Sequence, residues 1–369
     1  MWGLFTLGAA FSKSYSAILV CRLFIGFAEA LVQGGVLYLS FWYDYTELAT
    51  RAAVLSGVNA LAGGFSGLAA YSIQEHLNGR YGLSAWRWIF LIEGILPMGW
   101  SLVVFIFLPP APNNVRHGFT KSEKALLIQR AARSHNTGEN KIKPRLILRV
   151  LLDPQWWLLI SIQSCMFLCS STTSNFLPAI MAGLGYSGVR SQLMSVIPYA
   201  VLFVNILVVS RLSDRTQVRG PWIIACLVEA GIGYILLLKS TSLTARLIAT
   251  CLIAAGASSP AVICFAWIAS ANVGYTYRSS AVGMMNIVVN VVAIGGQQAF
   301  TDPPLYQKGL VVCFVMICVA VVLTVVAMVY FRSRNAKKRR EQVSEEAEML
   351  RGYSVDEIGN KHPDVFFTY

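Results

Sequence analysis

Apolar residues occur along this chain in long blocks, and the charged residues lie in the short stretches between them. Nine blocks are expected to form helices, at approximately 17–41, 52–73, 88–108, 155–181, 193–210, 222–238, 247–269, 281–299 and 310–331. A helix of about 20 apolar residues spans the ~30 Å hydrocarbon core of a bilayer. Met1–Phe11 is also apolar, but a helix of that length rises only ~16 Å, about half of a bilayer. The chain is therefore expected to begin within a transmembrane helix.

The composition agrees with this pattern. Of the 369 residues, 56% are hydrophobic and 13% are charged, and the mean hydropathy is +0.58. An average soluble domain is about one quarter charged. We therefore predict an all-α membrane protein with several spans, and the composition argues against a soluble protein.

The net charge is +12, and the basic residues are distributed unequally between the two sides of the predicted membrane. Loops 42–51, 109–154, 211–221 and 270–280 and the tail 332–369 together hold 22 Lys and Arg, whereas the opposite loops hold seven. The positive-inside rule then places the long loop and the C-terminal tail in the cytoplasm. No zinc-finger spacing or interleaved aromatic and basic groove indicates binding to nucleic acid.

The chain is predicted to have four regions, two helical bundles joined by a long central loop and a C-terminal tail. Residues 1–108 are predicted to form an incomplete N-terminal bundle of about four spans, 109–154 a cytoplasmic loop, 155–331 a bundle of six helices, and 332–369 a cytoplasmic tail. Within the loop, Thr120 and Glu123 have the spacing of a capping box that opens the helical run Ala125–Arg133. We interpret this run as a solvated helix on the membrane surface.

The 17–41 block contains two ionisable residues, which are costly in a membrane and indicate function. Arg22 and Glu29 are separated by two helical turns, and Gly26 and Gln33 lie on the same face. Arg22 offers a planar, permanently charged fork that suits a carboxylate, and Glu29 can exchange a proton. The alternative for Arg22 is that it extends to the membrane interface. This stripe predicts proton-coupled binding of an organic anion.

Other polar residues within the blocks indicate that the second half of the chain also contacts the substrate. Ser174 and Asn175 end a polar run that is unsuited to lipid, and Asn286 and Asn290 lie one turn apart. Interhelical hydrogen bonds would explain any one of them, but together they indicate a polar centre. In contrast, the stripe of small residues Ser56, Ala60, Gly63 and Gly67 predicts close helix packing.

The chain shows no arrangement that is typical of an enzyme. Its four histidines lie in predicted loops, and no glycine loop precedes a Lys-Ser or Lys-Thr pair that would hold a phosphate. The eight cysteines fall inside apolar blocks without metal-ligand spacing, and we interpret them as core residues. We therefore expect no enzymatic activity, no cofactor and no metal site.

Several segments, in order along the chain, resemble a family of transporters. Cys21–Ala30 resembles the fourth-helix signature of the anion:cation symporters in the major facilitator superfamily. The other segments that carry the resemblance are Trp42–Tyr43 with Glu47 and Arg51, Trp86–Gly94, Phe176–Pro178, Gly185–Ser187, Pro198–Ala200 and Ser213–Arg215. The tail segment Asp356–Asp364 is similar to fungal members related to allantoate and nicotinate permeases.

This resemblance implies a fold of twelve helices in two six-helix bundles, with alternating access and proton symport of a small organic anion. It implies that Arg22 contacts the substrate and that Glu29 couples protons. It also implies that Asp214, Arg215 and Arg219 form the second copy of a cytoplasmic gating motif, for which the alternative is a basic loop that follows the charge rule. In this alignment Trp2 falls within helix three, so the first two helices and part of the third are expected to be missing.

The sequence therefore predicts a secondary active transporter of a small carboxylate such as nicotinate or allantoate, coupled to protons. Arg22, Gln33, Ser174, Asn175, Asn286 and Asn290 are the predicted substrate-binding residues, and Glu29 is the predicted proton-coupling residue. We expect a monomer in the lipid bilayer, with the plasma membrane as its location and no nucleic acid as a partner. The alternative hypothesis is a membrane sensor without transport activity, or a degenerate transporter fragment.

Overall fold

The computed structural model describes most of the chain. The described residues are 1–30, 35, 38–39, 42–43, 48–109, 119–120, 122–127, 129, 144–183, 185, 188–272, 275–301, 306–342, 344–352, 360, 362–363 and 365–367. Within these ranges the regular structure is entirely helical. The predicted all-α fold is therefore confirmed.

Among the described residues before the central loop, four helices are present. They are α1 (Trp2–Phe11), α2 (Tyr15–Ala30), α4 (Leu48–His76) and α5 (Ala85–Phe107), with the short 3₁₀ turn η1 (Arg80–Gly82) before α5. Helix α1 contacts both α2 and α5. It approaches α5 closely, because a Cβ atom on Gly94 would lie 2.8 Å from the backbone nitrogen of Leu7.

The remaining described helices lie after the central loop, except for the first of them, which falls within its predicted range 109–154. They are α7 (Pro144–Leu151), α8 (Pro154–Gly183), α9 (Gly188–Met194), α10 (Val196–Thr216), α11 (Gly220–Lys239), α12 (Leu243–Ala271), α13 (Tyr275–Gln297), α14 (Gln307–Glu341) and α15 (Glu345–Arg351). The large buried cluster of the protein lies here, mainly between α8, α11, α12, α13 and α14. Its fully buried side chains include Trp156, Trp267 and Tyr234.

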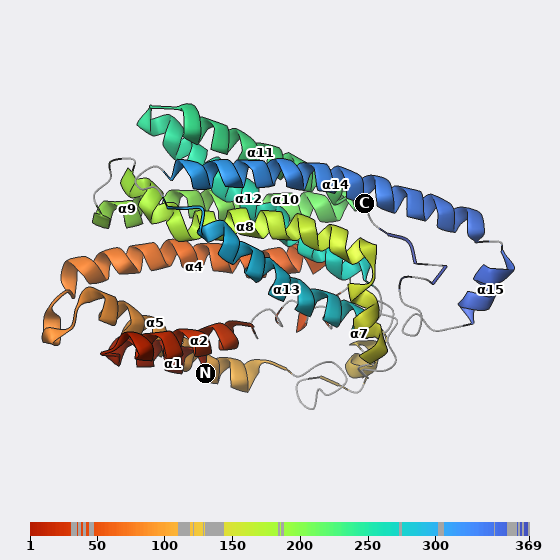
Figure 1. The fold of residues 1–369 in the computed structure, drawn as a ribbon. Coiled ribbons are helices and arrows are strands. Elements are labelled where there is room, and N and C mark those ends of the chain that lie inside the picture. Colours follow the sequence, from red (N-terminus) through yellow and green to blue (C-terminus); the bar gives the residue numbers. More distant parts are fainter. Residues whose placement is uncertain are drawn as a thin grey trace.

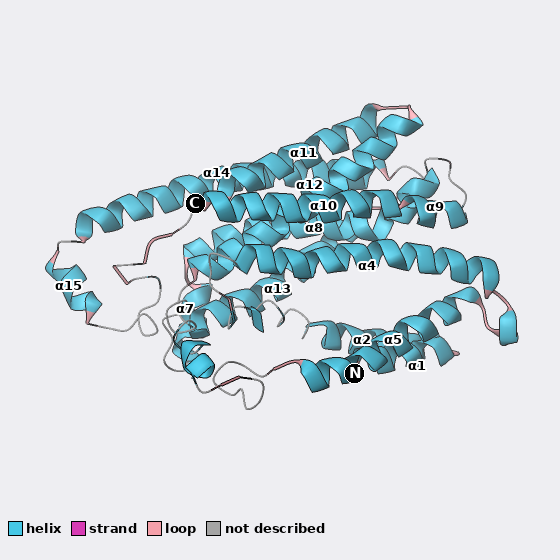
Figure 2. Cartoon of the chain, turned by 180° about the vertical axis from the view of Figure 1, so that it is seen from behind, coloured by secondary structure: helices cyan, strands magenta, loops and turns pink. Residues whose placement is uncertain are grey.

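Helix α4 joins the two parts of the molecule. Figures 1 and 2 show α4 between the group of α1, α2 and α5 on one side and the helices that follow the central loop on the other. Its main partner is α10, and it also contacts α9, α12 and α5. Helices from both parts of the sequence therefore meet along α4.

Six described segments are long and apolar enough to cross a membrane, and they lie where the sequence predicts spans. They are Ala85–Phe107, Arg190–Thr216, Gly220–Lys239, Leu243–Ala271, Tyr277–Gln297 and Gln307–Glu341. Helices α4 and α8 have 29 and 30 residues and coincide with the predicted blocks 52–73 and 155–181. Helix α1 confirms that Met1–Phe11 is helical.

The capping box in the central loop is confirmed. The backbone N–H of Thr120 donates to a Glu123 carboxylate oxygen at 2.8 Å, and the backbone N–H of Glu123 donates to the Thr120 hydroxyl at 3.3 Å. The Thr120 hydroxyl also donates to the same carboxylate oxygen at 2.8 Å, and the two hydrogen bonds that the carboxylate accepts lower the pKa of Glu123. Residues 122–127 are helical, while most of the predicted continuation to Arg133 lies outside the described residues.

A glycine in α12 permits a very close approach to α11. A Cβ atom on Gly256 would lie 2.5 Å from the backbone nitrogen of Ala230 and 2.5 Å from the carbonyl oxygen of Cys226. Both atoms belong to the backbone of α11, so they move only if the whole helix moves. This contact fixes the spacing of the two helices.

Replacing Gly256 with alanine is therefore expected to destabilise the protein, by about 1–3 kcal/mol or more, as overpacking of a buried contact does. The measurement is the unfolding temperature of the purified protein in lipid or detergent. Gly283→Ala is the matched control, because a Cβ atom on Gly283 would meet nothing within 4 Å and alanine is the better helix former. Equal unfolding temperatures for the two variants would contradict this explanation.

Candidate functional site

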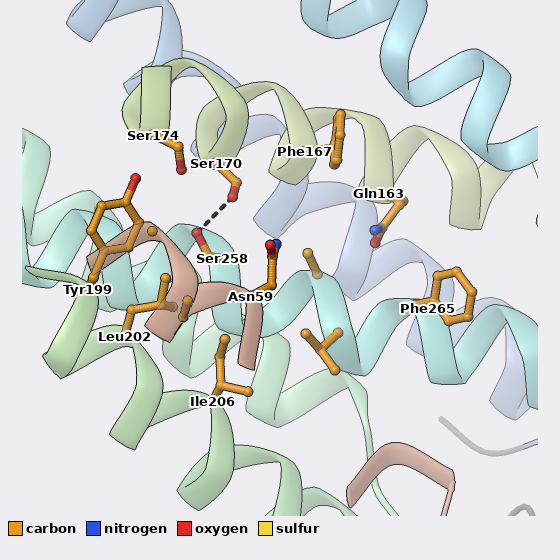
Figure 3. Close-up of a pocket in the computed structure, with 14 residues that line it drawn as sticks. Asn59, Gln163, Phe167, Ser170, Ser174, Tyr199, Leu202, Ile206, Ser258 and Phe265 are labelled. Atoms are coloured by element: carbon orange, nitrogen blue, oxygen red, sulfur yellow. Dashed lines mark hydrogen bonds between the residues drawn. The ribbon is translucent and has the colours of Figure 1, made fainter. Parts of the chain in front are cut away.

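A pocket of about 400 Å³ lies between four helices, where α4 meets the helices that follow the central loop. Figure 3 shows its lining side chains projecting from α4, α8, α10 and α12. They are Asn59, Ala60, Gly63, Gln163, Phe167, Ser170, Ser174, Tyr199, Leu202, Ile206, Ser258, Ala261, Val262 and Phe265. This size suits a small-molecule ligand.

The small residues of α4 determine how this pocket forms. A Cβ atom on Gly63 would lie 2.9 Å from the ring of Tyr199, and one on Gly67 would lie 3.0 Å from the carbonyl oxygen of Gln192. Ala60 is buried in the contact between α4 and α10. The predicted close packing of this stripe is confirmed for these three positions, and it brings Asn59 beside helices α8 and α12.

The pocket lining is uncharged and combines polar side chains with apolar and aromatic ones. Asn59 and Gln163 contribute amides, and the hydroxyl groups of Ser170 and Ser258 share a hydrogen bond of 2.7 Å that joins α8 to α12 (Figure 3). At the other end of the pocket, the Tyr199 hydroxyl points toward Ser174. None of these lining residues is an Asp, Glu, Lys, Arg or His. The lining therefore suits a neutral polar group or an aromatic ring.

Gln163 has an unused hydrogen-bonding atom. Its side chain is 5% exposed, and its Oε1 atom has no hydrogen-bond partner among the described residues. A buried amide oxygen without a partner costs free energy, about 1–3 kcal/mol. A ligand or a water molecule in the pocket that donates a hydrogen bond would remove this cost.

Of the polar residues of α8 and α13 that were predicted to bind substrate, only one lines the pocket. Ser174 lines the pocket, while the neighbouring Asn175 is exposed and is absent from the lining. Asn286 and Asn290 donate to carbonyl oxygens of their own helix, at Val282 and Asn286, over 3.2 and 2.8 Å. Neither asparagine lines the pocket, and their role in binding stays a prediction.

The predicted charged stripe lies on α2, away from the pocket lining. Arg22 and Glu29 are both exposed, and, apart from the adjoining residues and backbone of α2, no described atom lies within 4 Å of the position that a Cβ atom on Gly26 would take. Ile25 and Ala28 form a buried face of the same helix. The Arg22 guanidinium lies over the ring of Phe90 in α5, 5.2 Å from its centre. Gln33 lies outside the described residues.

The three residues of the predicted gating motif are divided between a buried pair and an exposed side chain. Asp214 and Arg219 form an ion pair of 3.5 Å, and their side chains are 9% and 4% exposed. Arg215 is exposed. Gln217 ends α10 with a left-handed backbone, φ 54°, and its side chain donates to the carbonyl oxygen of Asp214. This turn brings Arg219 back over Asp214.

The environment of Arg219 explains how its charge is held. It lies in the connection between α10 and α11, where burial lowers the pKa of its guanidinium and the neighbouring Asp214 carboxylate raises it. The Coulomb attraction between two charges is strongest where water is excluded. The pair therefore fixes the connection between the two helices.

Several pocket residues were not identified from the sequence as binding residues, among them the polar residues Asn59, Gln163 and Tyr199. Asn59 directly precedes the small-residue positions of α4, and Tyr199 lies within a segment that carried the family resemblance. Gln163 is a single amide in an apolar stretch of α8. Each of the three is a polar residue within an apolar stretch of the sequence. Only the packing of α4 against α8, α10 and α12 shows that they share a pocket.

Comparison with known proteins gives concordant results. The family model of the Major Facilitator Superfamily matches residues 1–297. The MFS-type transporter cnsO of Penicillium expansum is 30% identical over 98% of this chain and 73% of its own length. The high-affinity nicotinic acid transporter of Saccharomyces cerevisiae is 25% identical over 100% of this chain and 69% of its own length.

A solved structure shows the same fold. The proton:xylose symporter XylE, from E. coli, superposes with a TM-score of 0.68 at 13% sequence identity, covering 88% of this chain and 76% of its own. At this identity the likeness concerns the fold alone. It confirms the major facilitator fold that the resemblance implied.

Proposed function

The chain belongs to the Major Facilitator Superfamily of membrane transporters, and from that premise we propose that it carries a small organic anion across the membrane together with protons. As a member of this family it is a multi-pass membrane protein and not an enzyme. The proposal adds the chemical class of the substrate, the coupling ion and the residues that hold each.

The observation that carries the proposal is the open face of α2. Arg22 and Glu29 lie two turns apart on that face, and no described atom occupies the space beside Gly26 between them. A guanidinium binds a carboxylate through two parallel hydrogen bonds. The ring of Phe90 limits the positions that Arg22 adopts. We assign Arg22 to the substrate carboxylate and Glu29 to the proton.

The uncharged pocket supports a second part of the proposal. Its amides, hydroxyls and aromatic rings suit the neutral portion of a substrate, and its lining includes no charged residue. Charge and shape would then be recognised by separate groups of residues during transport. The similarity to a nicotinic acid transporter supports a carboxylate attached to a small ring.

The remaining predictions from the sequence enter this proposal unchanged. We infer that 1–108 and 155–331 act as two bundles joined by the loop 109–154, that the tail 332–369 is cytoplasmic, and that Asp214, Arg215 and Arg219 act as a gate. We further propose kinship with the anion:cation symporters, a monomer, and the plasma membrane as the location. Gln33, Ser174, Asn175, Asn286 and Asn290 remain candidates for substrate contacts.

The proposal is tested by measuring uptake of radiolabelled nicotinate and allantoate in cells that express this chain, at external pH values from 4.5 to 7.5. We expect uptake that rises as the external pH falls and that collapses when a protonophore is added. Nicotinamide, which keeps the ring and lacks the carboxylate charge, is the matched control ligand and is expected not to compete. Equal competition by nicotinamide would contradict recognition of a carboxylate, and a chain without any uptake would favour the sensor or degenerate-copy hypothesis.

Glu29→Gln is expected to remove the pH-driven accumulation of substrate while substrate exchange across the membrane continues. The amide keeps the size and hydrogen-bonding groups of the side chain but cannot take up and release a proton. Accumulation ratios and counterflow are the two measurements, with the exposed Glu75→Gln at the end of α4 as the matched control. Normal accumulation by Glu29→Gln would exclude the coupling role.

A further inference from the structure

The end of the chain returns to the last long helix and binds to it. Helix α14 has 35 residues and is about 52 Å long, so it exceeds the ~30 Å core of a bilayer. Its projecting end receives the tail, and both views show the C-terminus beside α14 (Figures 1 and 2). The Lys338 ammonium donates to the carbonyl oxygens of Asn360, His362 and Val365, at 2.8, 2.9 and 2.8 Å.

Phe367 is the anchor of this docked segment. Its side chain is 4% exposed, and its ring centre lies 5.4 Å from that of Phe331. Asn335 bonds the backbone of Phe367 in both directions, donating to its carbonyl oxygen at 2.7 Å and accepting from its N–H at 3.0 Å. The charged groups of Arg334 and Lys338 lie over the same ring, 5.2 and 4.9 Å from its centre.

The anchor is connected to two further helices. Arg334 donates to the side-chain oxygen of Gln155 in α8 at 2.9 Å. Gln155 is fully buried and donates in turn to the carbonyl oxygen of Ala271, at the end of α12, at 2.8 Å. On the apolar side, Phe331 also contacts Trp267 of α12, with ring centres 5.5 Å apart. The tail therefore contacts a network that includes α14, α8 and α12.

A second pocket of about 390 Å³ lies beside this network. Its lining includes Arg149, Asp153, Tyr277 and Arg334, and Asn360 of the tail forms part of its wall. Undocking of the tail would remove Asn360 from the wall of this pocket and would expose the buried ring of Phe367. The docked arrangement is therefore the one in which apolar surface is covered.

We propose that the described tail residues 360, 362–363 and 365–367 form an intramolecular clamp that holds the ends of α8, α12 and α14 together by keeping Arg334 against Gln155. Phe367 anchors the clamp, and Arg334 is the positioning residue that links it to α8. Because α8 and α12 also line the candidate pocket, release of the clamp loosens two of the helices that form it. The clamp does not depend on which substrate is carried.

Hydrogen–deuterium exchange of the purified full chain in lipid nanodiscs tests the clamp without any substrate. In Phe367→Ala, we expect amide exchange to be about tenfold faster both in the tail, 360–367, and in the first turns of α8, 154–165, because local opening controls exchange. Phe366→Ala is the matched control. Phe366 is the adjacent phenylalanine and is 41% exposed, so both regions should exchange as in the unchanged protein.

A second variant separates the anchoring role of Phe367 from the contact between Arg334 and Gln155. Arg334→Met removes the hydrogen bond to Gln155 and the charged group over the Phe367 ring. It leaves the hydrogen bonds of Lys338 and Asn335 with the tail, so exchange should rise in 154–165 while these bonds keep 360–367 protected. Faster exchange of the tail alone in Phe367→Ala would overturn the proposal, as would unchanged exchange in 154–165 for Arg334→Met. Equal effects of Phe366→Ala and Phe367→Ala would also overturn it.

Discussion

Replacing Arg22 with alanine is expected to abolish measurable uptake of a carboxylate substrate. Removing one partner of a charge pair that is buried and hydrogen-bonded, as Arg22 and the carboxylate are expected to be once substrate is bound, typically costs about 2–5 kcal/mol, which corresponds to roughly thirtyfold to several-thousandfold weaker binding. The substrate carboxylate would also lose the cation that compensates for its transfer out of water. Initial uptake rates over a range of substrate concentrations measure this effect.

Two further variants make the Arg22 result specific. Arg22→Lys keeps the charge but not the planar fork, and lysine does not replace arginine where two parallel hydrogen bonds are needed, so partial loss is expected. Arg80→Ala, at an exposed arginine of the turn η1, is the control for the loss of a positive charge. Uptake by Arg22→Ala at the rate of Arg80→Ala would remove Arg22 from the binding site.

Asp214→Asn is expected to be the most destabilising of the substitutions described here. Arg219 is 3% exposed, and its ion pair with Asp214 is 3.5 Å long. Removing one partner of a buried pair costs about 3–5 kcal/mol, because a buried charge remains without its counterion. A marked fall in the unfolding temperature of the purified protein is the expected result.

The double variant Asp214→Asn/Arg219→Met provides the internal check. Removing both charges eliminates the uncompensated cation, so the double variant should be more stable than Asp214→Asn alone. Arg215→Met is the matched control, since Arg215 is exposed and exposed ion pairs contribute at most about 1 kcal/mol. An additive, larger loss in the double variant would show that the pair is not what holds this connection.

These experiments address different parts of the molecule. The Arg22 and Glu29 variants concern recognition and coupling on α2, whereas Asp214 and Arg219 concern the connection between α10 and α11. The clamp of the tail on α14 is measured by amide exchange and needs no transport assay. Failure of the proposed substrate class would therefore leave the conclusions on the ion pair and the clamp unaffected.

The sequence by itself determined the helices and the faces that they present. A membrane span must satisfy its backbone hydrogen bonds internally, so blocks of about 20 apolar residues predict helices strongly, and α5, α8 and α10–α14 coincide with them. Helical periodicity also places Arg22, Gly26 and Glu29 on one face of α2. In the structure, the side chains of Arg22 and Glu29 are exposed, and no side chain fills the space beside Gly26.

Only the tertiary structure decided which of these faces meet. The pocket combines Asn59, Gln163, Tyr199 and Ser258, which lie far apart in the chain, because the glycines of α4 allow α10 to approach. Periodicity gives the direction of a side chain on its own helix but not the neighbour that it faces. For the same reason Asn286 and Asn290, which the sequence treats like Ser174, bond to their own helix instead of lining the pocket. The docking of Phe367 on Asn335 likewise depends on a return of the chain, since no local pattern specifies where a tail will bind.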